Sequence, residues 1–123
     1  MSNVTFVIVY VDDVARSEAF YASILGRRPV DSSPTFAMLP AAAGLTLGLW
    51  KRDGVRPPAN AAGGGEIAFT AGSEAEVEAL CAAWRDKGAA IALEPTRMDF
   101  GYTFVALDPD GQRLRVFAPA PEA

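Results

Sequence analysis

The chain has 123 residues, of which 50% are hydrophobic and 21% charged, and its formal net charge is −4. These values are typical of one compact globular domain, and the negative charge argues against a broad electrostatic surface for nucleic acid. The sequence contains one cysteine and no histidine. It therefore has no internal disulfide and is poorly suited to a conventional transition-metal site.

The N-terminus shows no targeting signal. Met1-Ser2-Asn3-Val4 carries neither a basic region nor a cleavage-like pattern, and the apolar run that follows stops at Asp12 and Asp13. No segment approaches the ~20 apolar residues of a membrane span. We therefore expect a cytoplasmic protein that does not contact a membrane.

The first half of the chain predicts a strand, a helix and two further strands. Residues 6–11 are β-branched and aromatic, which is typical of a strand. Asp13 is a suitable N-cap for a helix over residues 14–25, and a glycine directly follows that stretch. Two more strands are expected over residues 36–39 and 45–50.

The second half repeats this order. It follows residues 57–65, which contain two prolines and three glycines and are expected to form a linker. A strand over residues 66–70 leads to a helix that begins with Ser73 and Glu76, the pair of a capping box, whose hydroxyl and carboxylate each accept a backbone N–H. Three further strands are expected, over residues 90–93, 102–107 and 113–118.

Three features have a functional and a structural interpretation. The glycines at 63–65 resemble a phosphate loop, but they precede a strand rather than a helix. Asp108 and Asp110 suggest a metal, but Asp108-Pro-Asp-Gly111 has the composition of a tight turn. Cys81 lies on the apolar stripe of the second helix, where a core position is favoured over a nucleophile because no histidine can activate it.

The alternation of strand side chains predicts a face that points away from the helices. That face is expected to collect aromatic rings, among them Trp50, together with Glu66 and Arg115. Gly48 is expected to leave room beside Trp50. Aromatic surface with a few polar anchors is typical of a small-molecule site, although the same rings are also suited to pack against each other or against a partner subunit.

Several short motifs carry a family resemblance over nearly the whole chain. They are residues 11–14, 19–21, 25–26, 67–69 and 107–111. They resemble the glyoxalase / bleomycin resistance / extradiol dioxygenase superfamily, also called vicinal oxygen chelate proteins. The resemblance implies an α+β fold of two tandem βαβββ modules that form an open, cupped sheet, often in a homodimer. It also implies a single domain over residues 1–123, with modules at about 1–56 and 66–120.

Metal-dependent members bind their metal at the start of the first strand, at the start of the fifth and inside the last. The similar positions here are Phe6, Glu66 and Arg115, so only one of the three is a possible ligand and Arg115 would repel a cation. The resemblance thus implies no metal and no cofactor. Glu66 and Arg115 are instead suited to an ion pair, which either orients a ligand or is purely structural.

Further stretches point to one branch of the superfamily: residues 9–11, 34–36, 49–50, 66–67, 100–104 and 115–116. They resemble the antibiotic-binding resistance branch, in particular proteins that bind phenazine antibiotics. This resemblance implies metal-independent binding and sequestration of a small aromatic antibiotic, phenazine- or bleomycin-like, with no catalytic residue. The residues predicted to bind the ligand are Phe36, Gly48, Trp50, Glu66, Tyr102 and Arg115.

Other functions remain open. In a metal-free enzyme, Glu66 would act as general base and Arg115 would stabilise developing negative charge, with Tyr10 and Tyr102 as partners by residue type only. A metal-dependent enzyme would need an all-oxygen site completed by a dimer partner. A scaffold or regulatory role is the remaining alternative.

Overall fold

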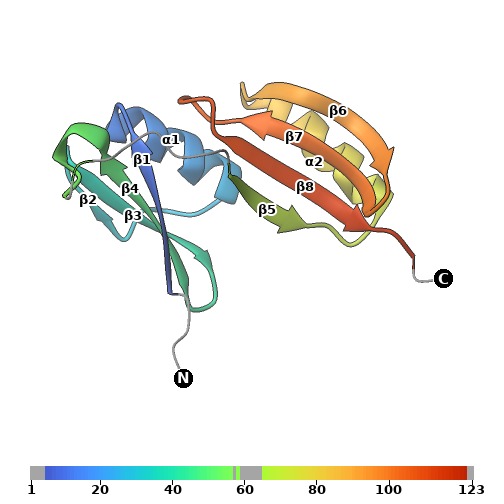
Figure 1. The fold of residues 1–123 in the computed structure, drawn as a ribbon, viewed down its shortest axis with the longest axis horizontal. Coiled ribbons are helices and arrows are strands. Elements are labelled where there is room, and N and C mark those ends of the chain that lie inside the picture. The colour runs from blue at the N-terminus through green and yellow to red at the C-terminus, as the bar shows by residue number, and fades with distance from the viewer. Residues whose placement is uncertain (1–4, 57, 59–64, 122–123) are drawn as a thin grey trace. The chain divides into compact units, whose positions relative to one another are not determined.

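The computed structural model describes residues 5–56, 58 and 65–121. The chain divides into two compact units, residues 1–62 and 63–123. Each unit contains one helix and one four-stranded sheet in the chain order β-α-β-β-β (Figure 1). The predicted α+β class and the two tandem βαβββ modules are confirmed. The predicted linker over residues 57–65, including most of its glycine run, lies outside the described residues apart from positions 58 and 65.

The first unit has the strand order β1-β4-β3-β2, with β1 parallel to β4 and the other pairs antiparallel. The predicted first strand and first helix are found over the residues expected. The third strand continues through Pro40 because the pairing shifts register between Pro40 and Ala42, and a bulge is where a sheet tolerates proline. The elements are β1 (Phe6–Val11), α1 (Val14–Leu25), β2 (Asp31–Ser32), β3 (Phe36–Ala42), β4 (Leu45–Lys51) and the 3-10 turn η1 (Arg52–Gly54).

The second unit repeats this arrangement, with the strand order β5-β8-β7-β6 and β5 parallel to β8. Its longest strand extends well past the predicted residues 90–93, through two register shifts against its neighbour. The elements are β5 (Glu66–Thr70), α2 (Glu74–Asp86), β6 (Ala90–Met98), β7 (Gly101–Leu107) and β8 (Arg113–Pro119).

Side-chain caps begin both helices. The Asp13 carboxylate accepts a backbone N–H in the first turn of α1, at 3.1 Å, and Gly26 ends that helix in the left-handed region with φ 65°. At α2, the Ser73 hydroxyl accepts the N–H of Glu76 at 3.1 Å. The Glu76 carboxylate accepts the N–H of Gly72 at 3.0 Å. In the predicted capping box it would accept the N–H of Ser73, the N-cap residue, so its partner lies one residue earlier than expected.

The core of each unit lies between its helix and its sheet. In the second unit, Trp84 of α2 is 4% exposed and packs edge-on against Phe69 and Phe104 of the sheet, with ring centroids 5.3 and 5.4 Å away. Cys81 is buried one turn earlier, and burial raises the pKa of its thiol. The predicted core position of Cys81 is therefore confirmed.

The turn between β7 and β8 is held together by the carboxylate of Asp108. Gly111 donates its N–H to the carbonyl of Asp108 at 3.0 Å, and one oxygen of the Asp108 carboxylate accepts the N–H groups of Asp110 and Gln112, both at 2.8 Å. Within the described part of the chain, no group of three or more His, Cys, Asp or Glu side chains is placed to hold a metal ion. None of the described helices is long and apolar enough to cross a membrane.

Candidate functional site

Each sheet has one face toward the helix of its own unit and one face turned away from it, which we call the distal face. Strand registers assign the residues of each distal face, as the predicted alternation required. In unit 1 they are Phe6, Ile8, Tyr10, Asp31, Phe36, Met38, Pro40, Thr46, Gly48 and Trp50. In unit 2 they include Glu66, Ala68, Thr70, Leu93, Thr96, Thr103, Val105, Leu107, Arg113, Arg115 and Phe117.

An aromatic cluster occupies the distal face of unit 1. Trp50 lies between two rings on neighbouring strands, with its centroid 6.1 Å from Phe36 and 6.4 Å from Tyr10, and both contacts are edge-to-face. Phe36 and Trp50 are half-buried and Tyr10 is 37% exposed. Part of the ring surface therefore remains accessible, although the rings also pack against each other.

Gly48 does not leave the empty space that the sequence suggested. A Cβ at this position would lie 2.9 Å from Cζ of Phe36 and 3.3 Å from Cγ1 of Ile8. The Phe36 ring occupies the room that the missing side chain provides. Gly48 thus makes room for the Phe36 ring beside Trp50, and contact of a ligand with Gly48 stays a prediction.

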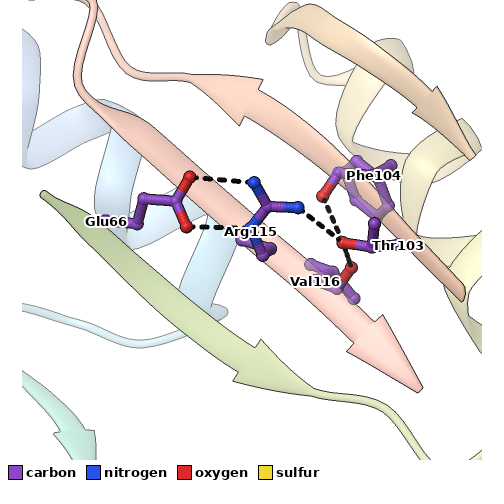
Figure 2. Close-up of polar contacts among 5 residues, drawn as sticks. All are labelled: Glu66, Thr103, Phe104, Arg115 and Val116. Atoms are coloured by element: carbon purple, nitrogen blue, oxygen red, sulfur yellow. Dashed lines mark hydrogen bonds and ion pairs between the residues drawn. The ribbon is translucent and has the colours of Figure 1, made fainter. Parts of the chain in front are cut away.

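The predicted ion pair is present on the distal face of unit 2. Arg115 of β8 donates through Nε to Oε1 of Glu66 at 2.8 Å and through Nη2 to Oε2 at 3.0 Å (Figure 2). The two side chains are only 18% and 30% exposed, so this pair is better shielded than a surface salt bridge. The hydrogen bonds and charge of Arg115 hold the pKa of Glu66 below its ordinary value, and Glu66 raises the pKa of Arg115.

Thr103 completes this polar group and was not predicted from the sequence. Figure 2 shows Arg115 between Glu66 of β5 and Thr103 of β7. Nη1 of Arg115 donates to the Thr103 hydroxyl at 3.2 Å, and that hydroxyl, which is fully buried, donates to the carbonyl of Val116 at 2.8 Å. The contact depends on the β7–β8 register, which residue types alone do not specify.

A second pair of rings lies beside the ion pair. The guanidinium carbon of Arg115 is 5.6 Å from the centre of the Phe100 ring, within the range of a cation–π contact. Phe100 is 46% exposed and packs edge-on against Phe117, with centroids 6.0 Å apart. Phe100, in the turn before β7, is a further residue that the predicted ligand-binding set omitted.

Tyr102 lies apart from the ion pair. It is opposite Ala118 and two residues from Phe104, which packs on Trp84 of the helix, so it belongs to the helix side of the sheet. Arg97 lies 5.4 Å above its ring, and Arg97 is bound to a carboxylate of α2. The structure therefore does not bring Tyr102 to the face that carries Glu66 and Arg115.

The residues at the expected metal positions do not fit a metal ion. Both carboxylate oxygens of Glu66 accept hydrogen bonds from Arg115, and the guanidinium would repel a cation. Phe6, on β1, offers no ligand atom. With Phe6, Glu66 and Arg115 in these positions, the donor set of the metal-dependent members is not reproduced.

Comparisons with known proteins agree with this architecture. Residues 3–116 match the profile of the Glyoxalase/Bleomycin resistance protein/Dioxygenase superfamily. The chain is 32% identical over 112 residues to the phenazine antibiotic resistance protein EhpR of Enterobacter agglomerans, covering 89% of this chain and 86% of that protein.

Two solved structures extend the comparison. A protein of Agrobacterium tumefaciens, solved by solution NMR, is 47% identical, with a TM-score of 0.88 over 98% of this chain and 100% of that chain. A glyoxalase/bleomycin resistance protein/dioxygenase family enzyme of Burkholderia phytofirmans PsJN is 19% identical, with a TM-score of 0.82 over 97% and 100% of the two chains. At that identity the likeness is one of fold alone.

Proposed function

The chain belongs to the glyoxalase/bleomycin resistance protein/dioxygenase superfamily, and from that premise we propose that it binds a flat aromatic antibiotic of the phenazine class. In this proposal the protein sequesters the compound without altering it and so confers resistance. The 32% identity to a phenazine antibiotic resistance protein supports the ligand class. The residue types at the metal positions support binding that does not depend on a metal.

The observation that carries the proposal is the aromatic cluster of unit 1. Trp50, Phe36 and Tyr10 lie on one face, where the residues contributed by β1, β3 and β4 are all uncharged and Asp31 on the edge strand β2 carries the one charge given by the registers. Such a surface favours a flat, apolar ring system, since each offset aromatic contact adds about 0.5–1.5 kcal/mol beyond the burial of area. Trp50, at the centre of the cluster, is the residue on which binding should depend most.

The geometry gives less support to the alternative of a metal-free enzyme. A general base works best with a pKa near the working pH, whereas the two hydrogen bonds from Arg115 lower the pKa of Glu66. Both oxygens of this carboxylate are also engaged. Proton abstraction by Glu66 would first require the ion pair to open.

We extend the proposal to the oligomeric state and expect a homodimer, as the resemblance to other superfamily members implies. Size-exclusion chromatography with light scattering should give twice the chain mass of 13.0 kDa. A mass of one chain at all concentrations would remove the dimer from the proposal and leave ligand binding untouched.

A tryptophan-fluorescence titration of metal-stripped protein with phenazine tests the proposal. We expect saturable one-site quenching with a micromolar or lower Kd, and mass spectrometry should recover the compound unchanged after long incubation. A bleomycin-type glycopeptide serves as the comparison ligand and should quench less. No saturable quenching by phenazine, or its conversion to a product, would contradict the proposal.

A further inference from the structure

Trp50 offers a hydrogen-bond donor that the described part of the chain does not use. An indole has one donor, the Nε1–H, and no acceptor. Every buried side-chain nitrogen and oxygen among the described residues has a partner, whereas no acceptor for the Trp50 N–H lies among them. Since Trp50 is half-buried, its nitrogen must belong to the part of the side chain that remains accessible.

A glycine leaves room next to this donor. Gly54 follows Trp50 by four residues, at the end of η1, and is exposed. A Cβ added at Gly54 would lie 3.8 Å from Nε1 of Trp50, and apart from its chain neighbours it would meet no other described atom within 4 Å. No side chain at this position therefore crowds the indole nitrogen, and a ligand atom is able to approach the N–H.

The charged residues that follow Trp50 in the chain are paired. The Lys51 ammonium lies 3.4 Å from Asp53, and the Arg52 guanidinium lies 3.6 Å from Asp12. Each pair is neutral overall, so neither offers an excess charge to an ionised ligand group. The one charge that the registers give to the distal face of unit 1 is that of Asp31, which would repel a carboxylate. The surroundings thus favour a neutral acceptor.

We propose that the indole N–H of Trp50 donates a hydrogen bond to a neutral acceptor in the plane of the ligand's ring system, so that Trp50 determines specificity for a nitrogen heterocycle. The inference rests on the proposed function and adds to it the atom that is recognised. A ring nitrogen of phenazine fits, because its lone pair lies in the ring plane and both faces of the ring stay free for aromatic contacts. A fused-ring hydrocarbon of the same shape has no such acceptor.

The first test compares phenazine with anthracene, the hydrocarbon of the same shape, in proton–nitrogen correlation spectra of the wild-type protein. A hydrogen bond moves an N–H proton downfield, whereas the ring currents of the two compounds are similar. We therefore expect phenazine to move the Trp50 indole proton further downfield than anthracene does. The indole of Trp84, which is buried in the core of unit 2, is the internal reference and should stay in place with both compounds.

The second test measures the affinities of both compounds by equilibrium dialysis. Trp50→Phe keeps an aromatic ring but removes the donor, and should lower the ratio of phenazine affinity to anthracene affinity about threefold, the effect of one neutral hydrogen bond. Trp84→Phe makes the same change in the core and should keep the wild-type ratio. Comparing ratios cancels the difference in hydrophobicity between the compounds, because that difference acts on every variant alike.

The outcomes separate this inference from the proposed function. If both compounds bind and move the Trp50 indole proton alike, or if Trp50→Phe keeps the wild-type ratio, the hydrogen bond is overturned while aromatic binding stands. If phenazine alone binds, an indole proton that does not move downfield from its place in the free protein overturns the inference as well. If phenazine does not bind, the proposed function is overturned and this inference with it. The spectra need only the wild-type protein, so they decide even if Trp50→Phe does not fold.

Discussion

The two units have the same strand order and the same pairing pattern, yet their distal faces differ in chemistry. In unit 1, Ile8 pairs with Gly48, and in unit 2 the corresponding pair is Ala68 with Arg115. The residue on the neighbouring strand also differs between the units. Phe36 lies opposite Trp50 in unit 1, and Thr103 lies opposite Phe117 in unit 2.

Position 48 and position 115 explain most of the difference. Where the strand has Gly48, a phenylalanine ring from the next strand fills the space. Where it has Arg115, a threonine hydroxyl from the next strand accepts the guanidinium. The same strand arrangement therefore carries an apolar ring surface in unit 1 and a charged group in unit 2, because two residues on adjacent strands differ together. This is why function follows from the site rather than from the fold.

Substitution of the two tryptophans should give the largest difference in stability between the core and the distal face. Trp84→Ala should cost about 3–5 kcal/mol of unfolding free energy, because it removes a buried ring from between Phe69 and Phe104. Trp50→Ala, the matched substitution on the distal face, should cost much less. Urea denaturation of the two variants measures both values. Equal losses would show that the cluster around Trp50 is as much a core as the one around Trp84.

Trp50 should matter more for ligand affinity than for the stability of the fold. Trp50→Ala should weaken phenazine binding at least tenfold, about 1.4 kcal/mol, while the circular dichroism spectrum stays unchanged. Trp50→Phe, which keeps a ring at the centre of the cluster, should stay within about threefold of the wild-type affinity. Isothermal titration calorimetry measures both. An unchanged affinity of the alanine variant would place the ligand elsewhere.

The ion pair of unit 2 should make the stability of the fold depend on pH. Because the folded-state pKa of Glu66 is lowered from 4.5, the pair stabilises the fold fully above that pH and loses this effect as the pH falls through the lowered folded value. Arg115→Met should therefore cost about 1 kcal/mol at neutral pH and progressively less below 4.5. Urea denaturation across this range measures the difference, and a difference independent of pH would contradict the assignment.

The smallest effect is expected at Gly48. In Gly48→Ala, the new Cβ lies 2.9 Å from the tip of the Phe36 ring, so the ring must shift. We expect a net loss of less than about 1 kcal/mol, because replacing a glycine inside a strand offsets part of the cost of overpacking. A change in Trp50 fluorescence should accompany it, because the two rings are in contact. The double variant Gly48→Ala with Phe36→Leu should relieve the clash. If Gly48→Ala leaves both stability and emission unchanged, Phe36 does not depend on the glycine.

Local patterns in the sequence predicted the elements that local interactions determine. The bounds of β1, α1 and β5 agree with prediction. A run of β-branched and aromatic residues specifies β1, and the capping Asp13 specifies the start of α1. The two-residue strand β2 was missed, since Asp31 and Ser32 form a strand only through pairing with β3. The length of β6 likewise depends on pairing with β7 and on two bulges.

The candidate site could be predicted only in part. Strand alternation was enough to place Glu66 and Arg115 on one face, and they form the expected ion pair. Contacts across strands could not be derived, because register is set by distant partners. For that reason the sequence does not predict the contact of Thr103 with Arg115, the position of Tyr102 on the helix side, or the Phe36 ring in the space at Gly48. The role of Tyr102 in ligand binding stays a prediction.

Chemical-shift mapping with phenazine is the most direct test of the central proposal, since a chain of 13.0 kDa suits two-dimensional NMR of its backbone amides. We predict saturable shifts at the distal face of unit 1, strongest at Trp50, Gly48 and Phe36, while the core around Trp84 stays unperturbed. Spectra that do not change on addition of phenazine, or changes confined to residues away from that aromatic cluster, would contradict the proposal that this protein sequesters a flat aromatic antibiotic there.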